Sequence, residues 1–179
     1  MQLIPHPRST YPRPLAIECD VFRANFTIGI QFVLHGRLDR LVIPESGEQE
    51  QRDDLWRHTC FEAFILPAGG EAYHEFNMAP SRAWAAYRFS SYRDGMEPSF
   101  LEPATLIHVE HGIHTLTQAA ILDFGDDRPL HGALEIGLSA VIESGDGPKS
   151  FWALAHPDGP PDFHNRDCFV AHLPPVEAP

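Results

Sequence analysis

The stretch Ala133-Leu-Glu-Ile-Gly-Leu-Ser-Ala-Val-Ile-Glu143 decides the fold class of this chain. Apolar residues stand at every second position, and the residues between them are mostly small or charged. Successive side chains of a β-strand point to opposite faces of the sheet. The alternation therefore predicts a strand with one apolar face rather than a helix.

Similar short segments occur along the rest of the chain. The 179 residues include 17 prolines and 13 glycines, and these turn-forming residues separate the segments at short intervals. No window repeats apolar residues at the spacing of an amphipathic helix. We therefore expect an all-β fold, an antiparallel sandwich or barrel of about ten strands with few or no helices. The further expected strands are Leu15–Phe22, Thr27–Leu34, Thr59–Leu66, Ala72–Met78, Ala83–Phe89, Ala104–Glu110, Ile113–Asp123, Phe151–Ala155 and Asp167–Leu173.

The length suits one domain, and the sequence contains no linker or internal repeat. We expect this domain to span residues 15–173. The flanking segments, 1–14 and 174–179, are rich in proline. We expect them to be tails that cover sheet edges or extend freely.

The charge balance limits the partners. With 13 basic and 25 acidic residues the net charge is −12, so nucleic acids and anionic membranes are disfavoured. No stretch is apolar over the length of a membrane span, and the first residues lack the apolar core of a secretory signal. Cys19, Cys60 and Cys168 fit no disulfide or zinc pattern. We expect a cytoplasmic protein in which at least two of these thiols are buried.

Histidines gather at His108, His111 and His114, which raises the hypothesis of a metal site. If His111-Gly112 forms a two-residue hairpin turn, His108 and His114 lie on opposite faces of the sheet. We therefore expect solvent-facing histidines around a turn and no metal site.

Two glutamates raise the hypothesis of hydrolysis. Glu62 and Glu75 lie on consecutive expected strands, and a hairpin through Pro67–Glu71 would bring their carboxylates near one another. Glycosidases use such a pair at a defined separation. Nothing in the sequence fixes that separation, and we expect no catalytic activity.

Aromatic residues at strand ends favour saccharide binding. Trp56 follows the acidic loop Glu48–Asp54 and precedes an expected strand, and Phe163-His164 lies in a late loop. Aromatic faces beside polar side chains suit sugars, which offer both C–H surfaces and hydroxyl groups. The alternative is that Trp56 and Trp152 fill the ends of the core.

The segment Asp54–Ile65 (DLWRHTCFEAFI) resembles the equivalent segment of family 9 carbohydrate-binding modules and DOMON-type domains. Four further segments resemble a group of small bacterial DOMON-like proteins, so the resemblance covers nearly the whole chain. These segments are Tyr73–Ser81, Trp84–Phe89, Phe151–Pro157 and Asp162–Phe169.

The resemblance implies an immunoglobulin-like or jelly-roll-like β-sandwich. In the sugar-binding relatives, two tryptophans clamp a saccharide with the help of a glutamate and an arginine. Trp56 matches the first tryptophan and Glu62 matches the glutamate. Arg82 or Arg88 is the candidate arginine, and the second tryptophan position falls near Phe163, where this chain departs from the pattern.

The resemblance also raises two cofactor hypotheses. Some relatives carry calcium, and the loop Glu48–Asp54 offers oxygen ligands, although its spacing matches no known calcium loop. Other DOMON relatives hold haem through a methionine and a histidine. The candidates here are Met78 or Met96 with His58, His156 or His164.

We therefore expect a non-catalytic domain that binds a small ligand, a carbohydrate or sugar-like metabolite, without a cofactor. The expected ligand-binding residues are Trp56, Glu62, Arg82, Arg88, Phe163 and His164. The alternatives are a structural or protein-interaction module without a ligand, including a homodimer, and a haem-binding domain.

Overall fold

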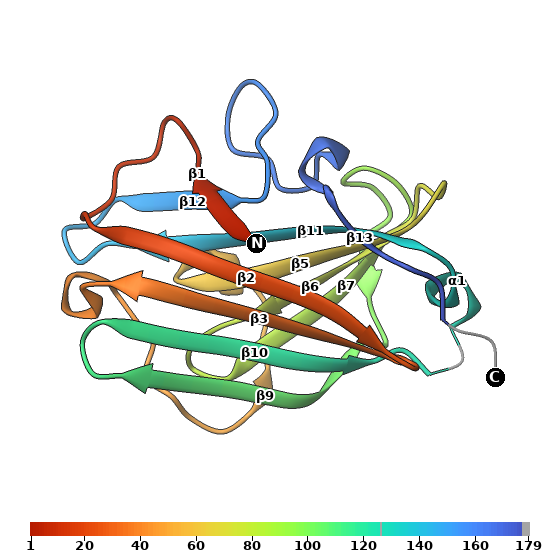
Figure 1. The fold of residues 1–179 in the computed structure, drawn as a ribbon, viewed down its shortest axis with the longest axis horizontal. Coiled ribbons are helices and arrows are strands. Elements are labelled where there is room, and N and C mark those ends of the chain that lie inside the picture. The colour runs from red at the N-terminus through yellow and green to blue at the C-terminus, as the bar shows by residue number, and fades with distance from the viewer. Residues whose placement is uncertain (126, 177–179) are drawn as a thin grey trace.

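The computed structural model describes residues 1–125 and 127–176. Its strands form one continuous sheet that curls into two facing layers (Figure 1). All but one of the strand pairs are antiparallel, the exception being the short pair of β4 with β7. The first layer consists of β2 (Leu15–Ala24), β3 (Thr27–Gly36), β10 (Thr115–Asp123) and β9 (Glu102–His111). The second consists of β4 (Glu50–Gln51), β7 (Ala83–Phe89), β6 (Tyr73–Met78), β5 (Cys60–Pro67), β11 (Leu134–Glu143) and β12 (Lys149–Ala153).

The N-terminal strand β1 (Gln2–Pro5) joins the two layers. Gln2 and Leu3 pair with β2, whereas Ile4 and Pro5 pair with β12. Residues 1–14 were expected to cover sheet edges or extend freely, and this part of the segment pairs with β2 and β12 as a strand of the sheet. Proline is tolerated at Pro5 because it lies at the end of the strand, where one ladder hydrogen bond less is needed.

The main core lies between the two layers. It contains the alternate apolar side chains of β3, β5, β10 and β11, and Phe32 of β3 lies 5.1 Å from Phe61 of β5 between ring centroids. Trp152 is 2% exposed and belongs to this core, which agrees with the core-filling alternative for that residue. The expected all-β antiparallel sandwich is confirmed.

The second layer is covered on both faces. Every residue of β6 and all but the last of β5 are buried, so neither strand has a solvent face. The outer face carries a second apolar cluster with Phe64, Phe89 and Phe169, and the segment 154–170 supplies part of its cover. In the sequence, a strand that is buried on both faces is typically a continuous run of apolar residues. The one apolar face expected for residues 133–143 is not observed either, because all residues of β11 except Glu135 and Glu143 are buried.

The hairpin between β9 and β10 has a different register from the expected one. His111 pairs with Thr115, so the turn comprises residues 112–114, with Gly112 at a φ of 61°. His108 consequently pairs with Gln118, and its Nδ1 lies 3.1 Å from Gln118 Oε1. The side chain of His108 is only 4% exposed, so the expectation that it faces solvent is wrong.

Helices are few and short, as expected. They are α1 (Arg128–His131) and three 3-10 turns, η1 (Leu38–Arg40), η2 (Leu55–Arg57) and η3 (Arg166–Cys168). Within the described residues none of them has the length and apolar character needed to span a membrane. All three cysteines are buried free thiols.

The last expected strand, Asp167–Leu173, is only partly formed. Its beginning belongs to η3, and only β13 (Ala171–Leu173) pairs with β11. One further two-residue strand, β8 (Glu97–Pro98), pairs with β7. Residues 177–179 of the expected C-terminal tail lie outside the described residues.

Candidate binding site

A cavity of about 930 Å³ opens on the outer face of the second layer. Its floor is formed by outward-facing residues of β5, β6, β7 and β11, and its walls come from the loops around residues 53–56, 93–98 and 161–164. This volume lies within the range of small-molecule sites. The lining residues are Asp53, Asp54, Trp56, Glu62, Glu75, Tyr87, Phe89, Arg93, Met96, Glu97, Pro98, Val141, Phe151, Pro161, Phe163 and His164.

Two carboxyl groups lie in the floor of the cavity. In the β5–β6 pair, Glu62 stands opposite Asn77 and Glu75 stands opposite Phe64, so the two glutamates are diagonal neighbours on the same face. Glu62 is 3% exposed and Glu75 is 6% exposed. Their hydrogen-bond donors are uncharged: Ser139 Oγ donates to Glu62 at 3.2 Å, and Asn77 Nδ2 donates to Glu75 at 2.7 Å.

Burial changes the titration of this pair. Loss of water around Glu62, together with the charge of Glu75, raises the pKa of Glu62 from 4.5 to about 8. Burial also raises the pKa of Glu75, although the Asn77 amide and the charge of Arg93 oppose this shift. The pair therefore retains a proton near neutral pH, because burial disfavours the charged form of each group and the charge of Glu75 disfavours ionisation of Glu62.

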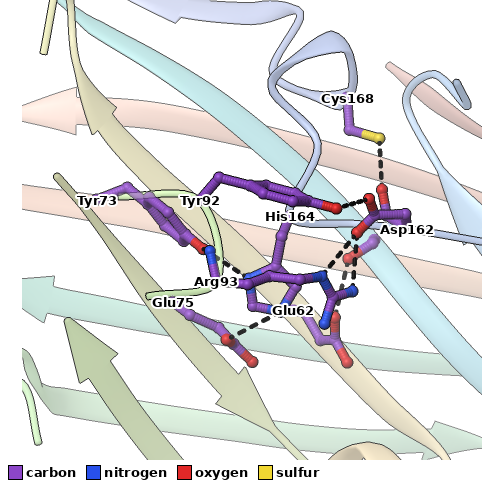
Figure 2. Close-up of polar contacts among 9 residues, drawn as sticks. Glu62, Tyr73, Glu75, Tyr92, Arg93, Asp162, His164 and Cys168 are labelled. Atoms are coloured by element: carbon purple, nitrogen blue, oxygen red, sulfur yellow. Dashed lines mark hydrogen bonds and ion pairs between the residues drawn. The ribbon is translucent and has the colours of Figure 1, made fainter. Parts of the chain in front are cut away.

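A cluster of polar contacts that we call the clamp lies beside the cavity and contributes Arg93 to its lining (Figure 2). The Arg93 guanidinium donates to Asp162 Oδ1 from Nη2 at 2.8 Å and from Nε at 3.2 Å, and the Tyr92 hydroxyl donates to Asp162 Oδ2 at 2.6 Å. Cys168 Sγ lies 3.3 Å from the Asp162 carbonyl oxygen. These contacts fasten the loop between β7 and β8 to the segment 154–170 that covers the outer cluster.

His164 links the clamp to the carboxyl pair. The Tyr73 hydroxyl accepts a hydrogen bond from the Arg93 backbone N–H, so its own proton points to His164 Nδ1 at 2.7 Å. This arrangement places the imidazole proton on Nε2, which lies 3.7 Å from Glu75 Oε2. Burial lowers the pKa of His164 to about 4, so the ring is neutral at physiological pH.

Trp56 stands at the rim of the cavity. It lies in η2, where the neighbouring Leu55 is buried and anchors the turn, while the Trp56 side chain remains 51% exposed. The Arg57 guanidinium carbon lies 5.5 Å from the indole centroid, but Arg57 is not part of the cavity lining.

The structure brings four of the six expected site residues to one cavity. Trp56, Glu62, Phe163 and His164 line it, with Phe163 only 8% exposed as part of a wall. Whether these residues bind a ligand stays a prediction.

The two expected arginines lie elsewhere. Arg88 follows Tyr87 on β7, and because adjacent strand residues point to opposite faces, it points away from the cavity and pairs with Glu97 at 2.8 Å. Arg82 lies in the turn between β6 and β7 and does not line the cavity. The arginine of the site is instead Arg93, which the sequence reasoning missed.

The structure also shows where several of the candidate haem and calcium ligands lie. Met78 is fully buried in the main core, whereas Met96 and His164 line the cavity. In the acidic loop, Asp53 accepts a hydrogen bond from the Tyr87 hydroxyl and Asp54 pairs with Arg57. Among the described residues, no group of three or more histidine, cysteine or acidic side chains is arranged to hold a metal ion.

Solved structures share this architecture. A candidate carbohydrate-binding protein from Bacteroides uniformis has a TM-score of 0.65 at 12% identity, over 96% of this chain and 84% of its own. A family 9 carbohydrate-binding module from Caldicellulosiruptor kristjanssonii in complex with cellotriose has a TM-score of 0.56 at 9% identity, over 97% of this chain and 81% of its own. This chain has the fold of a family 9 carbohydrate-binding module.

A family 9 carbohydrate-binding module from the same organism, in complex with glucose, has a TM-score of 0.53 at 7% identity, over 92% of this chain and 78% of its own. Identities this low show a shared fold and leave the ligand of this chain undetermined. No protein-family model and no curated protein matches the sequence.

Proposed function

We propose that this protein binds a saccharide, without catalysing a reaction, in the cavity on the outer face of its second layer. The observation that carries the proposal is the position of Trp56, whose half-exposed indole stands above a hollow floored by Glu62 and Glu75. Large apolar side chains are normally withdrawn from water, and an exposed ring beside a polar hollow is typical of a binding surface.

The lining suits the two-sided character of a sugar. Trp56, Phe89 and Phe163 offer aromatic surface for the C–H faces of a pyranose ring. Glu62 and Tyr87 offer polar oxygens to its hydroxyl groups. The solved structures with the same fold are described as carbohydrate-binding proteins, which supports the same assignment.

The carboxyl pair also suits hydrogen bonding with sugar hydroxyl groups. Burial raises the pKa of both Glu62 and Glu75, so the pair retains a proton near neutral pH. In this state the pair offers an O–H donor together with carboxylate oxygens that accept hydrogen bonds.

Tryptophan fluorescence tests the proposal directly. Of the three tryptophans, Trp84 is 8% exposed and Trp152 is 2% exposed, so the solvent-sensitive part of the emission comes from Trp56. We expect glucose, cellobiose or another saccharide of a small panel to shift this emission to shorter wavelength, with saturable binding. Trp56→Ala should remove the spectral change and weaken calorimetric affinity at least about tenfold.

Phe22→Ala is the matched control. Phe22 is 52% exposed, close to the value for Trp56, but it lies on β2 in the other layer. Its loss should leave saccharide affinity unchanged. Equal affinity of the Trp56→Ala variant and the unaltered protein would remove Trp56 from the site, and absence of binding by the whole panel would refute the proposed function.

A further inference from the structure

The charges around the cavity are strongly unbalanced. Five carboxyl groups line it against one guanidinium, that of Arg93. That guanidinium is already committed to Asp162 outside the lining, at 2.8 Å. The five carboxyl groups belong to Asp53, Asp54, Glu62, Glu75 and Glu97.

The imbalance is concentrated in the floor. At the rim, Asp54 pairs with Arg57 at 3.4 Å and Glu97 pairs with Arg88 at 2.8 Å. Glu62 and Glu75 make no ion pair with an arginine or lysine in residues 1–125 and 127–176, although the charge of Arg93 acts to lower the pKa of both carboxyl groups. The nearest imidazole, that of His164, is neutral because burial lowers its pKa to about 4.

Two oxygens of the floor, Glu62 Oε1 and Glu75 Oε2, accept no hydrogen bond from any described residue, and Glu75 Oε2 lies 3.7 Å from His164 Nε2. Glu62 Oε2 accepts from Ser139, but Oε1 accepts no hydrogen bond from any described residue, although the side chain is more than nine-tenths buried. Glu62 also lines the cavity, so a ligand there can reach this oxygen. Glu62 Oε1 is not among the fully buried side-chain atoms without a partner, so it is open to the cavity, and a ligand that supplies a donor can hydrogen-bond to it.

We propose that the preferred ligand is a saccharide carrying a protonated amino group, a hexosamine being the simplest example, with its ammonium group held between Glu62 and Glu75. This inference rests on the proposed function. An ammonium group provides three N–H donors and the positive charge that the floor lacks. A saccharide carrying a carboxylate would instead meet like charges and be excluded.

The electrostatic surroundings support this choice. A cation between the two carboxyl groups removes the repulsion that helps to raise their pKa values, so binding should release the proton that the free pair retains. Trp56 at the rim can also attract a cation through its ring face. The titratable groups that face the pair from neighbouring elements are Cys60 on β5, Tyr73 on β6, Tyr87 on β7, and Arg93 and His164 on the two loops.

Calorimetry with four sugars that share one ring tests the inference. Glucosamine and N-acetylglucosamine differ from glucose in the group at C2, and glucuronate differs from it by a carboxylate at C6. At about pH 6.5 the amine of glucosamine is largely protonated. We expect glucosamine to bind roughly tenfold more tightly than glucose and N-acetylglucosamine, and glucuronate not to bind. Of the four sugars, only glucosamine should release a proton on binding. The release is detected because the measured heat of binding then depends on the ionisation enthalpy of the buffer.

Glutamine substitutions in the floor of the cavity test whether Glu62 and Glu75 cause the preference for glucosamine. Glu62→Gln retains the shape and an acceptor for Ser139 but removes the charge, so it should abolish the preference for glucosamine while glucose still binds. Glu75→Gln should act in the same direction. Glu18→Gln removes one charge from the exposed face of β2 in the other layer and should leave the preference unchanged.

The outcomes separate the two proposals. Equal or tighter binding of glucose or N-acetylglucosamine would overturn the amino-sugar preference and leave saccharide binding intact. A glucosamine preference that survives in both floor variants would also overturn it. If none of the four sugars binds and Trp56→Ala changes nothing in a wider panel, the proposed function fails and the preference fails with it.

Discussion

Replacing Glu62 by glutamine should stabilise the protein, and increasingly so as the pH rises. In the folded protein, burial and Glu75 raise the pKa of Glu62 to about 8, whereas an unfolded chain returns it to about 4.5. Between these two values the folded state holds a proton that the unfolded state has lost. Stability therefore falls as the pH rises through this window, and the loss is complete above the folded pKa.

The size of the effect follows from the same two values. A pKa difference between 8 and 4.5, at 1.36 kcal/mol per pH unit, corresponds to up to about 5 kcal/mol above pH 8. Structural relaxation and water entry lower this figure. We expect Glu62→Gln to match the unaltered protein near pH 4.5 and to exceed its stability by about 2–5 kcal/mol near pH 9.

Urea unfolding measured between about pH 5 and pH 9 provides the assay. The buried Trp84 and Trp152 report unfolding in both proteins, so the same signal serves for each. Other titrating groups are common to the two proteins, and their contributions largely cancel in the difference. The quantity of interest is therefore the difference in unfolding free energy at each pH.

Glu135→Gln is a control of opposite sign. Glu135 lies on β11 and pairs with Arg166 through two hydrogen bonds of 2.9 and 2.8 Å, which lower the pKa of its carboxyl group. Its loss should reduce stability slightly at neutral pH, by about 0.2–1 kcal/mol. A Glu62→Gln difference that stays constant with pH, or that favours the unaltered protein at alkaline pH, would refute the assignment of an uncompensated buried carboxyl.

Two further predictions concern stability elsewhere in the sheet. Burial lowers the pKa of His74 and His164 to about 4, so the folded protein resists protonation that the unfolded chain accepts. In the Glu62→Gln variant, which lacks the opposing titration of Glu62, the melting temperature should fall as the pH drops from about 6.5 towards 4, and an unchanged melting temperature would contradict this. Gly137→Ala places a Cβ atom 2.5 Å from Phe169 Cδ1, so the outer cluster must shift and stability should drop by about 1–3 kcal/mol in urea unfolding, whereas equal stability would show that the ring moves freely.

Much of the fold could be predicted because alternation in a strand is a local property. The β11 pattern is legible in eleven consecutive residues, and the observed strand Leu134–Glu143 begins one residue later than the expected one. The burial of β5 and β6 on both faces was not predicted. Part of their outer face is covered by the segment 154–170. The sequence of a strand does not indicate whether a segment far away in the chain will pack against its outer face.

The candidate site, too, could be predicted from the sequence only in part. Glu62 and Glu75 were expected near one another, because both lie on strands joined by a short turn, and their diagonal register agrees with this. Arg93 was missed because its position depends on Asp162, which lies 69 residues away in the chain. Its left-handed backbone, with a φ of 54°, belongs to a loop whose path no periodic pattern reveals.

The carboxyl pair has no structural task that a neutral side chain could not perform. Ser139 and Asn77 donate to it, and both donors would serve a glutamine oxygen equally well. An entire domain is stabilised by only about 5–15 kcal/mol, so an uncompensated pair that costs several kcal/mol at alkaline pH is a large burden. Groups that destabilise the fold are found where a ligand needs them. Glu62→Gln is therefore expected to gain stability and to lose the preference for an amine. Both effects have one cause, which is that the floor of the cavity has no bound positive charge in the free protein.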